Sequence, residues 1–339
     1  MGPKRITLAD VAIEAGVSVQ TASHVLSENL SVRLPESTRQ RVKDAAKRVG
    51  YRPNRLAQAM KRGKSHVIGV WLPVDRPILA YLRFLQAVSS TAREQNYELM
   101  ITGLQGSDAY GATGKVPPLW PVDGIMGFDA GKAITALREN PAFDSTPVLI
   151  FGFETCSNGD SVAWDVAEAS KEVTRRLIQR GCRRIVHVTM DWVLSDFPRE
   201  QRRRGYSEAM LEAGLSPEFA TSEKETSSAA ETATLGFISE RGIPDAFTGF
   251  TDTLAIGAAR AVLSLGKAIP QDCKIWGFSD FPEAEDFRVP ISSIRLPMED
   301  VVDLGWKWLN ERIANPDIES RMAVLPMQII ERESTRSVS

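Results

Sequence analysis

Apolar residues recur at helical spacing on both sides of Gly16, between residues 6 and 26. Thr7 and Asp10 form a Thr-x-x-Asp capping box at the start of the first segment, and Ser18 is a suitable N-cap for the second. These signals predict two short helices joined by a turn at Gly16 and Val17. A helix-turn-helix of this kind can place its second helix in the major groove of DNA.

Two further helical patterns follow before the chain changes character. A third helix is predicted from about residue 35 to residue 49, and it ends before Pro53 because the residue preceding a proline is pushed out of the helical region. Residues 54–61 form a short helical pattern with Asn54 as its N-cap. A helix of this length is unstable alone in water, so we expect it to form only with a partner and DNA. A plain linker is the alternative.

From Val67 onward, apolar strand patterns alternate with helical ones, which predicts parallel sheets covered by helices on both faces. The alternation restarts after Ser161, so we expect two lobes, with a ligand at the carboxyl ends of the strands between them. Residues 103–122 are rich in Gly and Pro and are predicted to be mostly loop. The predicted strands are 67–73, 97–103, 122–128, 147–153, 183–190, 246–250 and 274–280, and the predicted helices are 80–95, 166–180, 201–213 and 253–265.

The net charge of −2 conceals a basic head on an acidic body. Residues 1–64 carry 13 Lys and Arg against 5 Asp and Glu, whereas residues 65–339 carry 28 against 38. This asymmetry favours phosphate binding by the N-terminal part alone. No apolar run is long enough for a membrane span, and the N-terminus has no apolar signal core, so we expect a cytoplasmic protein. The three cysteines, Cys156, Cys182 and Cys273, are scattered and predict reduced buried thiols rather than a metal site.

The motifs TLADVA, AGVS, TASHVL, TRQRV, GYRPNRLAQAM and IGV are similar, in this order, to the headpiece and hinge of the lactose-repressor (LacI/GalR) family of bacterial transcription regulators. Similarity continues at VDGIM, GCRRIVHV, the segment 251–280 and IERESTRS, and it thins between residues 103 and 122. The resemblance implies an α/β protein: an all-α helix-turn-helix headpiece, then a two-lobed effector domain shaped like a periplasmic binding protein, with parallel sheets. The implied ranges are a headpiece at 1–52, a hinge helix and linker at 53–65, an N-lobe at about 66–161 plus 295–322, and a C-lobe at about 162–294 plus 323–339.

The helix-turn-helix places Val19, Gln20 and His24 on the exposed leading face as base readers, with Thr21 and Ser23 nearer phosphate. The resemblance adds a hinge helix that pairs with its dimer mate in the minor groove and wedges an apolar side chain between base pairs. Here the wedge position is Met60, where leucine is usual. The expected DNA-binding residues are Thr7, Ser18, Val19, Gln20, Thr21, Ser23, His24, Asn54, Arg55, Ala57 and Met60.

The resemblance also implies an effector pocket, and the chain departs from the family at several of its positions. Arg202 stands three residues before Gly205, as does the arginine that grips an effector in the family, although a solvated helix start is the other interpretation. Ser279 replaces an aspartate, Thr251 replaces an asparagine, and Gly152 stands where some sugar-binding members carry aspartate. Trp164, Trp192 and Phe281 could stack on a ring, although core packing is an alternative for each. The expected effector residues are Asp75, Arg76, Trp164, Arg202, Thr251, Asp252, Ser279 and Asp280.

An enzyme is disfavoured, because the three histidines are scattered and no catalytic triad, paired-carboxylate motif or phosphate-binding glycine loop has the necessary spacing. A secreted solute-binding protein would have the lobes but no DNA-binding head. The sequence therefore predicts a DNA-binding transcriptional regulator: a repressor that binds a palindromic operator as a homodimer and responds to a small-molecule effector, with no metal, cofactor or membrane partner. A sugar, a sugar acid or a related metabolite is one candidate effector, and an unusual ligand is another, because the pocket departs from the family pattern. A dimer is preferred to a tetramer because no leucine heptads follow IERESTRS. A ligand-independent regulator with a vestigial pocket, or an activator, is the alternative.

Overall fold

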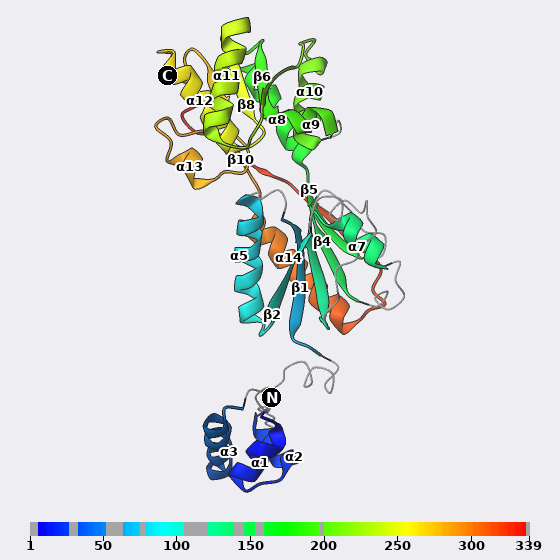
Figure 1. The fold of residues 1–339 in the computed structure, drawn as a ribbon. Helices are drawn as coiled ribbons and strands as arrows, with labels where there is room; N and C mark the ends of the chain where they lie inside the picture. Colours follow the sequence, from blue (N-terminus) through cyan, green and yellow to red (C-terminus); the bar gives the residue numbers. More distant parts are fainter. Residues whose placement is uncertain are drawn as a thin grey trace. The chain divides into compact units, whose positions relative to one another are not determined.

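The computed structural model describes residues 6–26, 33–51, 64–74, 79–104, 121–138, 146–152, 159–196 and 200–336 (Figure 1). The chain divides into two compact units. The first comprises residues 1–67 with 119–123 and contains the headpiece, and the second comprises residues 68–118 with 124–339 and is called the body below. The predicted hinge residues Asn54, Arg55, Ala57 and Met60, the predicted effector residues Asp75 and Arg76, and Cys156 lie outside the described residues.

The headpiece consists of three helices, α1 (Leu8–Ala15), α2 (Val19–Leu26) and α3 (Glu36–Val49). Both predicted helices of the helix-turn-helix are therefore confirmed, as is the third. Their apolar faces meet in one small core, formed by Val11, Ala12, Ala15, Ala22, Val25, Val42, Ala45 and Ala46. Five of these eight residues are alanines, which lets the short helices approach closely.

The N-lobe of the body is built on a six-stranded sheet with the order β11-β5-β4-β3-β1-β2. Its paired strands run parallel wherever the register is defined, for example Ile68 opposite Gly124 and Met322 opposite Ser161. The strands are β1 (Val67–Pro73), β2 (Glu98–Leu104), β3 (Gly124–Phe128), β4 (Val148–Phe151), β5 (Asp160–Trp164) and β11 (Met322–Leu325). The helices are α5 (Leu79–Glu94), α7 (Gly131–Arg138) and α14 (Met298–Ala314).

Side chains alternate along β3 and so assign the helices to the two faces of this sheet. Gly124 faces Leu309 of α14, and Phe128 packs on Phe84 of α5 with ring centroids 4.8 Å apart. Gly127 points the other way, towards Ile134 of α7. α5 and α14 therefore cover one face and α7 the other, which is the three-layer arrangement that buried parallel strands require.

The C-lobe has a four-stranded parallel sheet with the order β7-β6-β8-β9. The strands are β6 (Ile185–Met190), β7 (Glu218–Ser222), β8 (Ala246–Gly249) and β9 (Lys274–Trp276). On one face lie α8 (Val166–Gln179) and α10 (Gln201–Glu212); the remaining helices are α9 (Asp191–Asp196), α11 (Ser227–Arg241), α12 (Asp252–Ser264) and α13 (Pro282–Glu285). Val186 and Val188 pack with α11 and α12, whereas His187 stacks on Tyr206 of α10. The predicted α/β architecture with two lobes is confirmed.

The chain crosses between the two lobes more than once, and the crossings lie a few residues from the expected lobe boundaries. β5 and β11 belong to the N-lobe sheet and reach Trp164 and Leu325, a few residues beyond the expected limits of 161 and 322. The difference arises because each strand is completed by its parallel neighbour across the crossover. A separate antiparallel pair, β10 (Ser293–Arg295) with β12 (Gln328–Ile330), lies on two of the connections between the lobes.

Cys182 and Cys273 are free and buried, as expected. Among the described helices, none has both the length and the apolarity that crossing a membrane demands.

His187 gives the body a predictable response to acid. The side chain is buried and bonds to the Thr248 hydroxyl, with Nδ1 and Oγ1 2.9 Å apart. Burial lowers the pKa of His187 to about 3, helped by the positive charges of Arg202 and Arg203. Its ordinary pKa of about 6.5 applies to the unfolded chain, so unfolding takes up a proton below that pH. The stability supplied by the neutral ring is present above pH 6.5 and is lost as the pH falls towards 3.

The change His187→Gln should therefore weaken the acid dependence of the body's unfolding free energy between about pH 6.5 and pH 4. Glutamine retains a hydrogen-bonding group for Thr248 but does not titrate. Urea unfolding at a series of pH values measures this, and His24→Gln in the headpiece is the control. An unchanged slope in the His187 variant would contradict the assignment.

Candidate functional site

The helix-turn-helix is fixed by the local signals that the sequence shows. The Asp10 amide donates to Thr7 Oγ1 and the Thr7 amide donates to Asp10 Oδ2 at 2.7 Å, which completes the predicted capping box. Gly16 ends α1 with φ +60°, a left-handed conformation that glycine adopts without strain. The Thr21 amide donates to Ser18 Oγ at 3.0 Å, so Ser18 caps α2. The angle between the two helices is thus set by their caps and by the headpiece core.

The second helix presents a short exposed face. Ala22 and Val25 are buried in the headpiece core, while Val19 and Gln20 are exposed at the start of α2. Ser23 and His24 are half-buried further along the helix. The hydroxyls of Ser18 and Thr21 lie 2.8 Å apart and bond to each other, so both contribute to the cap. Gln20 is therefore the exposed residue of this face with both a donor and an acceptor for a base edge.

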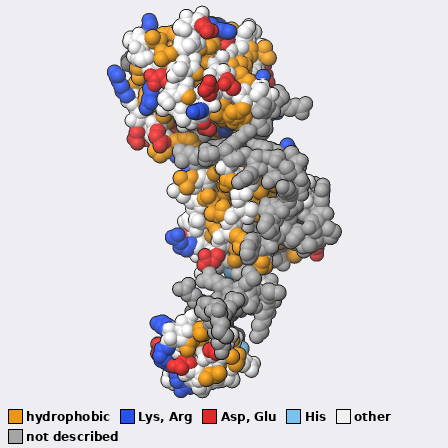
Figure 2. All heavy atoms as spheres, in the orientation of Figure 1, with side chains coloured by type: hydrophobic (Ala, Val, Ile, Leu, Met, Phe, Trp, Pro, Cys, Tyr) orange, Lys and Arg blue, Asp and Glu red, His pale blue; other side chains and the backbone are white. Residues whose placement is uncertain are grey.

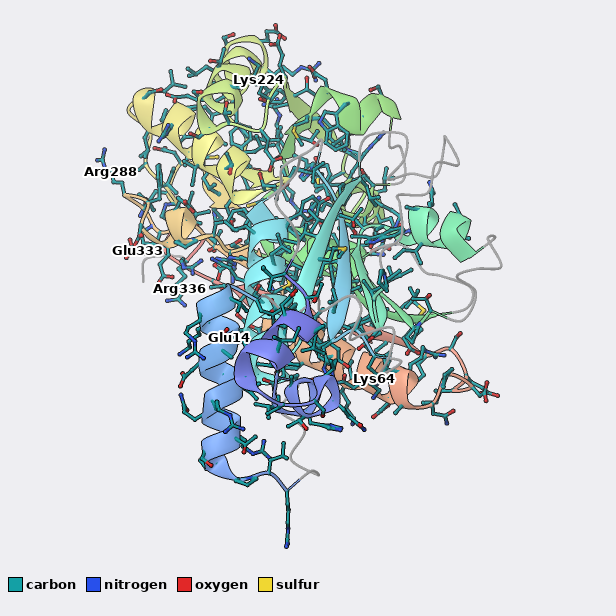
Figure 3. The ribbon with its side chains drawn as sticks, turned by 60° about the horizontal axis from the view of Figure 1, so that its bottom comes forward. Glu14, Lys64, Lys224, Arg288, Glu333 and Arg336 are labelled. Carbon is teal, nitrogen blue, oxygen red and sulfur yellow. The ribbon has the colours of Figure 1, made fainter. Side chains whose placement is uncertain are left out.

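Basic side chains lie along one side of the headpiece in the view of Figure 2. Those of α3 are Arg39, Arg41, Lys43, Lys47 and Arg48. Arg48 is engaged within the headpiece, because its Nε lies 2.9 Å from Oε1 of Glu14, a residue of α1 labelled in Figure 3. Arg41, Lys43 and Lys47 are exposed, and cations on this helix can neutralise phosphates, in agreement with the charge asymmetry of the sequence.

In the body, Arg202 lies among groups carried by the carboxyl ends of the C-lobe strands. Arg202 is the second residue of α10, and Glu200 caps this helix by accepting from the Arg203 amide at 2.9 Å. The guanidinium of Arg202 lies between the rings of Phe250 and Phe278, with its central carbon 4.1 Å and 4.4 Å from their centroids. These rings follow β8 and precede the loop after β9, respectively.

The polar contacts of Arg202 leave part of its donor set unused. Arg202 Nη1 donates to Glu200 Oε1 at 3.2 Å, and the side chain is only 14% exposed. Its Nε atom is buried and has no hydrogen-bond partner among the residues described. Burial raises the pKa of Glu225, and the nearby Thr251 hydroxyl and Arg202 charge oppose this rise. A guanidinium, two carboxyls and two aromatic rings thus meet at one edge of the sheet, which suits a small polar molecule with an apolar face.

The other predicted effector residues are placed differently. Trp164 is 4% exposed and packs on Phe128 in the N-lobe core, with ring centroids 5.5 Å apart. Gly152 has φ +118°, where a residue with a side chain would be strained, and a Cβ at this position would lie 2.0 Å from Asp129 Oδ1, so the Asp129 side chain would have to move. Thr251 lies beside Phe250 and is 2% exposed, and Ser279 is half-buried after β9.

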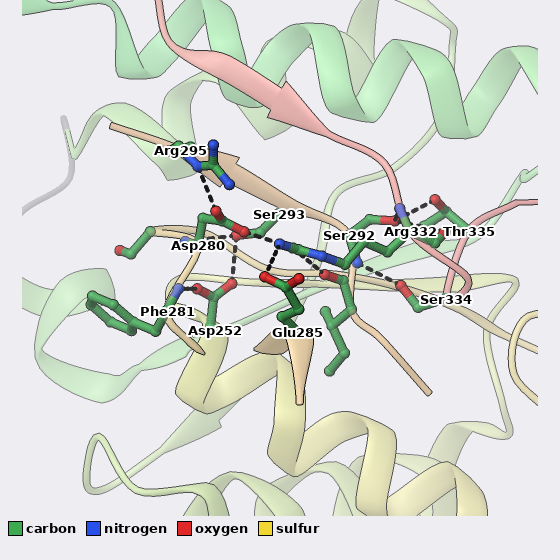
Figure 4. A network of polar contacts seen from close by, with 12 residues as sticks. Asp252, Asp280, Phe281, Glu285, Ser292, Ser293, Arg295, Arg332, Ser334 and Thr335 are labelled. Carbon is green, nitrogen blue, oxygen red and sulfur yellow. Dashed lines mark hydrogen bonds and ion pairs between the residues drawn. The ribbon is translucent and has the colours of Figure 1, made fainter. Parts of the chain in front are cut away.

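Asp252 and Asp280 are held in a network of polar contacts at the crossover between the lobes (Figure 4). Asp252 accepts from the Ser293 hydroxyl at 2.6 Å and from the Phe281 amide at 2.7 Å, and burial raises its pKa to about 6. Asp280 accepts from Arg295 and Arg332, both at 2.6 Å. Burial alone would raise the pKa of Asp280, but these two arginines lower it overall. Both carboxylates therefore already have protein partners.

Comparison with known proteins finds matches for both the helix-turn-helix headpiece and the body. Residues 7–54, which contain α1 to α3, match the family described as bacterial regulatory proteins, lacI family. Residues 174–335 match the periplasmic binding protein-like domain. The chain belongs to the LacI/GalR family. It is accordingly a DNA-binding transcriptional regulator.

Similarity to individual LacI/GalR proteins extends over the whole chain. Catabolite control protein A of Staphylococcus aureus is 28% identical over 346 residues, covering 98% of this chain and 99% of that protein. The Lac repressor dimer bound to operator and the anti-inducer ONPF has the same fold, with a TM-score of 0.77, 20% identity, and coverage of 98% and 100% of the two chains. The complex of the transcriptional regulator CelR with cellobiose gives a TM-score of 0.61, with 23% identity and coverage of 97% and 100%.

Sequence reasoning missed several residues that this LacI/GalR protein brings to the carboxyl edge of its C-lobe sheet. Phe250 and Phe278 flank Arg202, and the carboxylate of Glu200 forms an ion pair with it. The aromatic residue that ends each of the segments AFTGF and KIWGF was a usable signal, because it follows a predicted strand directly. Glu225 had no such signal, since it precedes Thr226, the N-cap of α11, and the pattern of α11 did not predict a helix.

Proposed function

We propose that this chain is an effector-responsive repressor that binds a palindromic operator as a homodimer. The observation that carries the proposal is the unpartnered, buried Nε of Arg202, which lies between two rings at the carboxyl edge of the C-lobe sheet. An oxygen atom of a ligand would give this donor a partner, and the pairing would be favourable because a buried polar group without a partner is costly. The same chain carries the LacI-type headpiece, so a ligand site and a DNA-reading unit are covalently joined.

The mechanism follows from a two-state equilibrium between arrangements of the lobes. An effector that binds one arrangement more tightly shifts the population towards it, and operator affinity changes by the difference in ligand affinity. On DNA, Val19, Gln20 and His24 would face base edges, while Ser18, Thr21, Ser23 and Thr7 would lie nearer the backbone. The hinge residues Asn54, Arg55, Ala57 and Met60 would pair with the second copy in the minor groove. Such a protein acts in the cytoplasm, at the nucleoid.

The effector would be a small polar metabolite such as a sugar or sugar acid. Arg202 offers a planar donor edge for vicinal oxygens, and Phe250 and Phe278 supply apolar surface beside it. A relative of the same fold binds cellobiose, which supports this class of ligand. Thr251 and Ser279 are neutral hydroxyls at the same edge and would add short polar contacts, with Asp75 and Arg76 as further predicted contributors.

A ligand-independent regulator is the second candidate, and specific contacts favour it. Asp252 and Asp280 already bond to Ser293, Arg295 and Arg332, and Trp164 is buried in the N-lobe core. Three of the predicted ligand contacts thus serve the protein's own packing, so the remaining polar edge is small.

Thermal unfolding of the full chain against sugars, sugar acids, sugar phosphates and purines separates the two candidates. A ligand that binds only the folded state raises the midpoint by mass action, so the operator need not be known. A rise with one ligand class, accompanied by a change in operator affinity, is the expected result. Unchanged midpoints and unchanged operator affinity across the panel would favour the ligand-independent regulator.

Replacing Arg202 with alanine should abolish the effector response while leaving DNA affinity in the absence of effector intact. The change removes the guanidinium between the two rings but does not touch the headpiece. Arg204→Ala is the matched control, because Arg204 lies on the same helix, is 52% exposed and pairs only loosely with Glu208 at 3.7 Å. Operator binding is titrated with and without the ligand found by thermal unfolding. An Arg202 variant that still responds fully would remove this residue from the site.

A further inference from the structure

Two consecutive non-glycine residues, Ser279 and Asp280, adopt left-handed backbone conformations in the loop after β9. Their φ angles are +104° and +53°. The backbone of a non-glycine residue is strained at such φ angles, although less for aspartate than for most residues. The conformation persists only when neighbouring groups enforce it. The loop follows Phe278, whose ring packs on Arg202. The strained loop therefore lies next to the proposed effector site, and contacts from both lobes keep it in this conformation.

From the N-lobe, Arg83 of α5 reaches the two carbonyl groups of this loop. Its Nη1 donates to the Ser279 carbonyl at 3.2 Å, and its Nη2 donates to the Asp280 carbonyl at 2.9 Å. The guanidinium also lies over the Phe281 ring, 5.1 Å from its centroid. A planar fork is well matched to two adjacent acceptors, which a single ammonium group is not.

From the C-lobe, the amide groups of the same two peptides are held by side chains (Figure 4). The Asp280 amide donates to Ser293 Oγ at 3.0 Å, and the Phe281 amide donates to Asp252 Oδ2 at 2.7 Å. The Ser293 hydroxyl in turn donates to Asp252 Oδ1 at 2.6 Å. Ser293 lies on the crossover strand β10, so this side of the loop is tied to a connection between the lobes.

The carbonyl of one residue and the amide of the next belong to a single rigid plane. Each of the peptides 279–280 and 280–281 is therefore gripped on one edge by Arg83 and on the other by Ser293 or Asp252. These three side chains together are called the peptide clamp. Neither peptide can rotate without breaking bonds on both edges, and the clamp is complete only while α5 stays close to the loop.

We propose that Arg83 is a positioning residue that makes the loop bearing Ser279 depend on the position of the N-lobe. When the lobes move apart, Arg83 withdraws, the two strained peptides relax, and Phe278 loses its fixed position against Arg202. Conversely, a ligand that fixes Phe278 and Ser279 favours the arrangement in which Arg83 is engaged. In this account Asp252 and Asp280 do not read the ligand; they hold the frame on which Ser279 and Phe278 are presented.

Hydrogen–deuterium exchange of the full chain tests the clamp without any ligand. The variants are Arg83→Ala, Arg83→Lys, which keeps the charge but loses the fork, and the control Arg93→Ala, an exposed arginine on the same helix. Exchange of the Asp280 and Phe281 amides should be at least about tenfold faster in Arg83→Ala, intermediate in Arg83→Lys and unchanged in Arg93→Ala. Amides of β9 should be unaffected. Wild-type exchange at Asp280 and Phe281 in a folded Arg83 variant would overturn the clamp, and the lysine variant decides if the alanine variant does not fold.

Operator affinity provides a readout that a merely structural arginine would not move. If the clamp couples the lobes, Arg83→Ala changes the operator dissociation constant by about threefold or more, the range typical of residues that carry such coupling. Arg93→Ala leaves it unchanged. Equal operator affinities in the two variants would overturn the coupling even if exchange had accelerated. This second readout rests on the proposed effector-responsive function, whereas exchange does not, so the failure of one is distinguishable from the failure of the other.

Discussion

Replacing Asp160 with asparagine should lower the free energy of unfolding of the body by about 3–5 kcal/mol, because it leaves a buried cation without its counter-charge. Asp160 is fully buried at the start of β5. Arg312 of α14, 5% exposed, donates to both of its oxygens at 2.8 and 2.9 Å. Arg321, just before β11, donates to it from its side chain and its backbone amide at 3.0–3.2 Å. One carboxylate therefore joins three segments of the N-lobe.

The pH dependence of this ion pair has a defined sign. Burial alone would raise the pKa of Asp160, but the hydrogen bonds from Arg312 and Arg321 lower it overall. A lowered pKa in the folded state means that the stabilisation is present above the ordinary pKa near 3.8 and is lost below it. The difference between wild type and Asp160→Asn in urea unfolding should thus be full at pH 7 and shrink in acid. Asp317→Asn, an exposed change nearby, is the control. A loss below about 1 kcal/mol at pH 7 would show that the ion pairs of Asp160 with Arg312 and Arg321 are not needed for the stability of the body.

Placing an aspartate at Val25 should unfold the headpiece and lower operator affinity at least about a hundredfold, which corresponds to about 2.7 kcal/mol. Val25 is 1% exposed and packs in the small core with Val11 and Val42. A core of this size supplies little stability, and an unpaired buried carboxylate costs several kcal/mol, so the three helices cannot absorb the change. The body should keep its own unfolding transition, because it has separate cores.

The matched control for this prediction is Ile13→Asp. Ile13 lies on α1 and is 79% exposed, so the same change of an apolar residue to an acidic one buries no charge there. Circular dichroism follows the helices, and fluorescence anisotropy with labelled operator follows binding. If the Val25→Asp variant bound operator as well as the Ile13→Asp variant does, DNA recognition would not depend on this folded headpiece.

The headpiece could be predicted from the sequence because its signals are local. Thr7 with Asp10, Gly16 and Ser18 each act within one turn of the chain, and the structure uses each of them as a cap or a stop. The central strands were predictable for a similar reason, since β1, β3 and β4 are continuous apolar runs that only a doubly covered parallel sheet can bury.

Two of the strands that were missed depend on partners far away in the chain. β5 and β11 are short, and each becomes a strand by pairing with the other across 161 residues, as Ser161 and Met322 do. The same holds at the candidate site. Asp252 and Asp280 stand at the expected carboxyl edge, but Ser293, 41 residues after Asp252, and Arg332, 52 residues after Asp280, occupy their oxygens. Sequence spacing did not show that the oxygens of these carboxylates already have partners within the protein.

The most direct test of the central claim is selection of binding sites by the full chain from random double-stranded DNA, with the mass of the selected complex measured. A homodimeric regulator should enrich a palindromic site with two half-sites and should bind it as two protein chains per DNA. Gln20→Ala should relax the preference within each half-site without abolishing binding. Enrichment of no sequence over random DNA, or of an asymmetric site bound by a single chain, would contradict the account.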